Sequence, residues 1–143
     1  MQLGVDGGRR GLGVGASVLA VLHAALLLLA LPILALMILS TAWEGGDAAL
    51  DSRLQSWGML LGVLNLVAAA LLIAGGVQLK GSPAVARRLL QVSSAVLVAM
   101  AASWAWVFRG TLVDPLMLGA WALLTIPGLV AALLAHAERS GAP

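Results

Sequence analysis

Four long stretches of this sequence contain no charged side chain, and this feature constrains the fold more than any other. They run from Leu12 to Ser40, from Leu54 to Leu79, from Leu89 to Phe108 and from Pro115 to Ala137. An α-helix rises about 1.5 Å per residue, so about 20 apolar residues suffice to cross the hydrocarbon core of a bilayer. The sequence therefore predicts an all-α integral membrane protein, an antiparallel bundle of four transmembrane helices.

The overall composition fits a membrane protein. Of the 143 residues, 62% are hydrophobic and only 10% are charged, and a water-soluble domain could not cover so large an apolar surface. The net charge is only +2 and the eight basic residues are scattered, so we expect no nucleic-acid partner. The chain contains no cysteine, which excludes disulfides, thiolate metal sites and thiol redox chemistry.

Local signals indicate where the helices begin. Ser82-Pro83 and Asp114-Pro115 each place an N-cap residue before a first-turn proline, which is typical of a helix start. Pro32 and Pro127 fall inside apolar stretches and should bend their helices. We expect helices over about residues 12–40, 54–79, 83–108 and 115–137, with a flexible Gly-rich tail over 1–11 and a short tail over 138–143.

The basic residues predict the orientation in the membrane. Six of the eight Lys and Arg residues lie in the N-terminal tail, the second loop and the C-terminal tail, whereas Arg53 and Arg109 lie in the first and third loops. Short loops rich in Lys and Arg stay on the cytoplasmic side. We therefore expect both termini to be cytoplasmic, in a bacterial-type inner or plasma membrane.

Small residues recur along one face of the second helix. They follow helical spacing with Asn65 and Leu72 between them, and they let two helices approach closely in lipid. We interpret them as a helix-packing seam, in preference to a ligand groove: Gly58, Gly62, Ala69 and Gly76. Similar small-residue patterns occur on the third helix (Ala95, Ala99, Ser103) and on the fourth (Thr125, Gly128, Ala132).

Each predicted helix also carries one polar side chain near the bilayer midplane: His23, Asn65, Ser94 and Thr125. Counted from the helix starts, His23 and Asn65 lie at similar depth. Burying either without a partner costs roughly several kcal/mol, so we expect both to face inward and to bond to one another. This polar layer is interpreted either as interhelical glue or as a proton or solute path. We prefer glue, because no Asp, Glu, Lys or Arg lies within the uncharged stretches.

The tryptophans cluster toward one side of the membrane. All five lie toward the predicted outer side: Trp43, Trp57, Trp104, Trp106 and Trp121. A lipid-headgroup belt ordinarily marks both interfaces. These residues are therefore candidates for contacts with outer lipids or with a partner. Trp104 and Trp106 are two residues apart and must point in different directions on a helix.

The sequence offers no catalytic, cofactor-binding or metal-ligating set. His23 and His136 are the only histidines, and they lie too far apart in depth to share a metal ion. We therefore expect a non-catalytic accessory or scaffolding subunit of a membrane assembly, with the bilayer and other membrane subunits or a second copy as partners. The main alternative is a small oligomeric channel or transporter for a proton, small solute or lipid. The third is a membrane enzyme with an unrecognised site.

Overall fold

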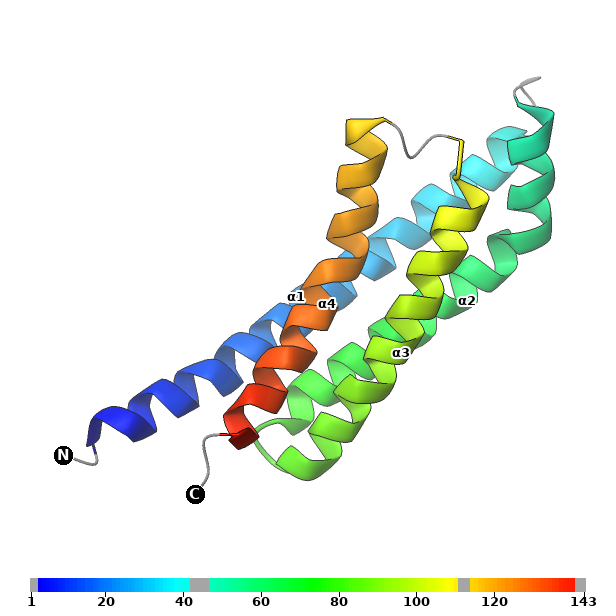
Figure 1. Cartoon of the computed structure of the whole chain (residues 1–143). Coiled ribbons are helices and arrows are strands. Elements are labelled where there is room, and N and C mark those ends of the chain that lie inside the picture. The colour runs from blue at the N-terminus through cyan, green and yellow to red at the C-terminus, as the bar shows by residue number, and fades with distance from the viewer. Residues whose placement is uncertain (1–2, 42–46, 111–113, 141–143) are drawn as a thin grey trace.

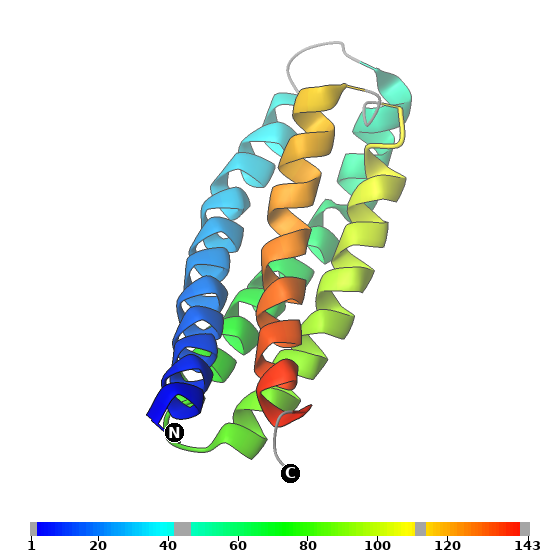
Figure 2. The same cartoon turned by 60° about the vertical axis from the view of Figure 1, so that its left-hand side comes forward.

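The computed structural model describes residues 3–41, 47–110 and 114–140, and the regular structure in these ranges consists of four helices (Figure 1). They are α1 (Leu3–Thr41), α2 (Ala48–Gln78), α3 (Pro83–Val107) and α4 (Pro115–Ser140). Successive helices run antiparallel, so α1 begins and α4 ends at the same end of the bundle (Figure 1 and Figure 2). We call this the terminal end and the opposite one the distal end. The predicted all-α, four-helix bundle is confirmed.

All four helices are long and apolar enough to cross a membrane. The mean hydropathy of their spanning segments ranges from 1.5 in α3 to 2.7 in α1. Large aliphatic side chains such as Leu29, Val63, Val98 and Leu133 lie exposed on the outside of the bundle. A water-soluble bundle carries charged and polar side chains there. The chain is thus an integral, multi-pass membrane protein whose outer surface contacts lipid.

The two predicted proline starts are confirmed, since α3 begins at Pro83 and α4 at Pro115. An Asp114 carboxylate oxygen accepts a hydrogen bond from the Leu116 N–H at 2.8 Å, whereas Ser82 makes no side-chain capping bond. The structure adds a third capped start. Asp47 accepts a hydrogen bond from the Ala49 N–H at 3.0 Å, so α2 begins at Ala48, before the uncharged stretch does.

The first helix extends beyond its uncharged stretch as well. It begins at Leu3, so residues 3–11, which the sequence assigns to a flexible tail, are helical. Glycine weakens a helix by about 1 kcal/mol but keeps the backbone N–H that proline lacks, so this segment contains no residue that removes a helix hydrogen bond. Pro32 and Pro127 remain inside α1 and α4, and α4 changes direction near its middle (Figure 1).

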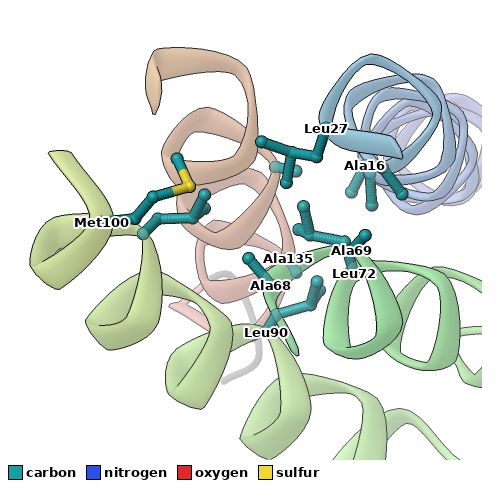
Figure 3. Close-up of a cluster of buried hydrophobic side chains, with 12 residues drawn as sticks. Ala16, Leu27, Ala68, Ala69, Leu72, Leu90, Met100 and Ala135 are labelled. Carbon is teal, nitrogen blue, oxygen red and sulfur yellow. The ribbon is translucent and has the colours of Figure 1, made fainter. Parts of the chain in front are cut away.

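The helices pack as a ring in which each contacts two neighbours, and α1 contacts α4 as well as α2. The main core combines alanines with a few larger side chains, so the helices approach closely (Figure 3). It includes Ala16, Leu27, Ala68, Ala69, Leu72, Leu90, Met100 and Ala135. A second cluster at the distal end contains Leu34, Leu54, Leu61, Val107 and Phe108.

Candidate functional site

His23 joins the first helix to the last. Its side chain is 1% exposed, and its Nε2 atom lies 2.8 Å from the backbone carbonyl oxygen of Leu124 in α4. A carbonyl oxygen only accepts hydrogen bonds, so Nε2 must carry the proton and donate it. In the neutral ring Nδ1 is then an acceptor, and it has no hydrogen-bond partner among the described residues.

Gly128 makes room for this imidazole. A Cβ atom added at Gly128 would lie 2.5 Å from His23 Nδ1 and 2.5 Å from Leu97 Cδ1, far inside van der Waals contact. Gly128 lies one residue after Pro127, whose ring removes the backbone donor that would bond to the Leu123 carbonyl. The α4 surface that receives His23 therefore combines an absent side chain with a proline that disturbs the helix locally.

Asn65 is fully buried, but its carboxamide has no partner. Neither Oδ1 nor Nδ2 forms a hydrogen bond among the described residues. The predicted hydrogen bond between His23 and Asn65 is therefore wrong, and the helix register explains why. Gly62 faces Leu31, and His23 lies eight residues from Leu31 while Asn65 lies three from Gly62. The two side chains are thus offset by about five residues, or about 8 Å along the helices.

The two hydroxyl residues of the predicted polar layer bond within their own helices. The Ser94 hydroxyl donates to the Leu90 carbonyl at 2.9 Å, and the Thr125 hydroxyl donates to the Trp121 carbonyl at 2.5 Å. The fully buried serine of α3 is Ser93 instead, and it also bonds to Leu90. These hydroxyls replace their lost hydration with backbone bonds, and so they connect neither His23 nor Asn65 to another helix.

The α2 seam, composed of Gly58, Gly62, Ala69 and Gly76, packs inside the monomer. A Cβ atom at Gly58 would lie 2.5 Å from Ile38, and one at Gly76 would lie 3.2 Å from the Ser17 carbonyl oxygen, both in α1. The Ser17 hydroxyl donates to the Gly76 carbonyl at 2.8 Å across this contact. Gly62 is looser, with Leu31 at 4.0 Å. These glycines therefore serve the α1–α2 contact.

The small residues of α3 point the other way. Ala95 and Ala99 are exposed, and Ser103 is half-buried and donates to its own helix at Ala99. Ala102 is also exposed and continues the same face. The buried side chains of α3, among them Leu90 and Leu97, lie on the opposite side of the helix. We call Ala95, Ala99 and Ala102 the outward α3 stripe.

The tryptophans divide into two environments, with Trp43 outside the described residues. Trp57 and Trp106 are exposed at 41% and 50%, and the Arg109 guanidinium lies 4.6 Å from the Trp106 ring centre. Trp121 is half-buried and donates its Nε1–H to the Ala101 carbonyl at 3.0 Å. Trp104 is half-buried and stacks on Phe108, and its buried Nε1–H has no partner among the described residues. Sequence spacing indicates that Trp104 and Trp106 diverge, but only the packing shows which one turns inward.

A groove of about 380 Å³ lies between α1 and α4 in the distal half of the bundle. Its lining is almost wholly apolar and includes Leu26, Met37, Trp104, Phe108, Leu116 and Leu124. A volume of this size is typical of small-molecule sites. The sequence does not predict this groove, because it arises from the relative direction of two helices far apart in the chain.

The titratable residues do not gather into a reactive centre within the described ranges. No group of three His, Asp or Glu side chains there could hold a metal ion. His136 is exposed near the terminal end, away from the buried His23. What the described site offers is helix packing, one interhelical imidazole bond, an unpartnered carboxamide and an apolar groove.

Comparison of the chain with protein-family models, with curated proteins and with solved structures finds no match.

Proposed function

We propose that this protein is a non-catalytic accessory or scaffolding subunit of a membrane assembly and that it acts through helix–helix contacts. The observation that carries the proposal is the outward α3 stripe, where Ala95, Ala99 and Ala102 are exposed on a membrane-facing surface. We assign this stripe the role of receiving a transmembrane helix of another subunit or of a second copy.

The contrast with α2 supports this assignment. In lipid, apolar side chains gain little by leaving the solvent, so helices associate through close packing that small residues allow. Gly58 and Gly76 use this property within the monomer, where they meet α1. The outward α3 stripe has the same character but faces away from the buried side of α3. Close packing at this stripe is therefore available to a partner helix.

Single-cysteine crosslinking tests the proposal, because the natural chain contains no cysteine. Ala99→Cys in native membranes should give a discrete adduct with a short bismaleimide. Ala70→Cys is the matched control, since Ala70 is an exposed alanine on α2. An adduct of twice the monomer mass identifies a second copy, and one of another mass identifies a different subunit.

A bulky substitution provides the second arm. Ala99→Leu should reduce the crosslinkable complex about tenfold or more while leaving thermal unfolding of the purified monomer unchanged, because the side chain points away from the core. Ala70→Leu should change neither. The proposal is contradicted if Ala99→Cys gives no adduct beyond the Ala70→Cys background and Ala99→Leu leaves complexes in native membranes unchanged.

A small channel or transporter is the second candidate, and one observation favours it. His23 Nδ1 and both polar atoms of Asn65 are buried without partners, as expected of groups that bind a transient proton or solute. In this case His23→Gln should abolish a pH-dependent flux into proteoliposomes while the unfolding midpoint stays nearly constant. Equal flux from wild type, His23→Gln and empty vesicles would remove this candidate.

A further inference from the structure

The groove between α1 and α4 has the length of a single membrane leaflet. Along α1 its lining runs from Leu26 to Met37, eleven residues and so about 16 Å. The hydrocarbon core of a bilayer is about 30 Å thick, so one leaflet contributes about half of that. The groove starts at the distal end, beside Leu116 of α4, and reaches Leu124, whose carbonyl accepts the His23 bond. It therefore follows the path of one acyl chain from the interface to the midplane.

One polar atom marks the wall of this otherwise apolar groove. Trp104 contributes to the lining, and its buried Nε1–H has no acceptor among the described residues. Trp104 lies three residues before the end of α3 at Val107, about 5 Å along the helix, and hence near the membrane interface. The ester carbonyls of glycerolipids lie at this level and accept hydrogen bonds.

A cation lies next to the same end of the groove. Arg109 is exposed and directly follows Phe108, which lines the groove. The Arg109 guanidinium stacks on the Trp106 ring at 4.6 Å, an arrangement that fixes its position without neutralising its charge. A guanidinium held at the interface is complementary to a lipid phosphate.

These three features favour a phospholipid over a partner helix. The backbone carbonyls of a transmembrane helix are already bonded within that helix, so they leave the Trp104 N–H without an acceptor. A phospholipid supplies an apolar chain, an ester acceptor and an anionic phosphate in the order in which the groove presents Leu26, Trp104 and Arg109. We propose that the groove holds one acyl chain of a phospholipid from the leaflet at the distal end, with an ester carbonyl on Trp104 Nε1–H and the phosphate beside Arg109. This site does not depend on the outward α3 stripe.

Lipid retention during purification tests the site. The wild-type chain, purified in mild detergent and supplied with phosphatidylglycerol, should keep about one molecule per monomer in native mass spectrometry. Ala120 lines the groove, so Ala120→Phe should fill it and lower the apparent affinity at least tenfold. Ala70→Phe, which adds the same ring on the outside of α2, should leave the affinity unchanged.

Two further variants test the polar contacts separately. Trp104→Phe keeps an aromatic ring but removes the N–H, and it should weaken phosphatidylglycerol binding about fivefold, the loss of about one hydrogen bond. Trp57→Phe, at an exposed tryptophan outside the groove, should weaken it not at all. Arg109→Gln should weaken phosphatidylglycerol binding but not that of diacylglycerol, which lacks the phosphate, and Arg53→Gln should affect neither.

The same measurements can overturn the proposal. If Ala120→Phe retains as much lipid as wild type, bound lipid lies elsewhere on the surface. If the wild type retains no phospholipid, and Ala120→Phe dissociates a protein complex in native membranes, the groove holds a partner helix instead. The unfolding midpoint of each variant without added lipid separates a failure to fold from a loss of binding.

Discussion

His23 and Asn65 are buried to the same extent, yet they differ in what they contact. The sequence predicts that both face inward, because an unpaired polar group in hydrocarbon is costly. It does not predict their partners, because these depend on the register of α1 against α2 and of α1 against α4. That register is set by particular close contacts, such as His23 against Gly128, and not by distance from a helix start.

The space at Gly128 makes a sharp prediction at the scale of one methyl group. Gly128→Ala should lower the free energy of unfolding by about 1 to 3 kcal/mol, because the new Cβ atom would displace His23 or Leu97. Gly119→Ala is the matched control on the same helix, where nothing lies within 4 Å of the added atom. It should be neutral or stabilising by up to about 1 kcal/mol, since alanine is the better helix former. Denaturant titration in detergent measures both.

Asn65 predicts a substitution that stabilises the bundle. Asn65→Leu replaces an unpartnered carboxamide by an apolar group of similar size, so the free energy of unfolding should rise by about 1 to 2 kcal/mol. His23→Phe removes a bond that is made, and it should instead lower the free energy by about 1 kcal/mol. A destabilised Asn65→Leu protein would show that the carboxamide has a partner, such as a bound water or solute.

Among whole helices, the starts of α3 and α4 are the most predictable features. Ser82-Pro83 and Asp114-Pro115 act locally, through the φ angle and missing donor of proline, and so they can be recognised in the sequence. The ends of the uncharged stretches predict less, because a helix continues into water whenever no residue stops it. This is why α1 and α2 begin at Leu3 and Ala48, ahead of their apolar parts.

The α1–α2 contact predicts different tolerance at two glycines of one seam. Gly76→Ala places a Cβ atom 3.2 Å from the Ser17 carbonyl oxygen, and it should destabilise the bundle by about 1 to 3 kcal/mol. Gly62→Ala meets only Leu31, at 4.0 Å, and should cost less than 1 kcal/mol, as an ordinary contact does. Thermal unfolding of the purified variants compares them. Equal losses at the two positions would contradict the tight and loose ends of this contact.

For the molecule as a whole, the number of spans and their antiparallel order are readable from the sequence, because hydrophobic length is a property of each segment alone. The groove is not, because it depends on how α1 and α4 lie against each other. The unequal environments of Trp104 and Trp106 have the same origin. Spacing separates their directions, but the neighbouring helices determine which direction is inward.

The orientation of the bundle in the membrane is a further prediction, and it rests on the six basic residues at the terminal end against two at the other. Asp47→Cys in intact cells should react with an impermeant maleimide added outside, whereas Ser82→Cys should react only after permeabilisation. Asp47 and Ser82 are both exposed, so accessibility within the fold does not bias the comparison. Reversed labelling would place the termini outside.

The contact between α1 and α4 also bears on how such a chain is made. In a chain inserted helix by helix, α4 emerges after the other three, and until it packs, the His23 imidazole lacks the Leu124 carbonyl as its acceptor. A nascent protein interrupted before α4 thus presents an unsatisfied ring to lipid, together with the α1 and α3 surfaces that α4 covers. An incomplete product therefore carries a local polar defect within the bilayer, which gives membrane proteases and insertases a chemical means of distinguishing it from the finished one.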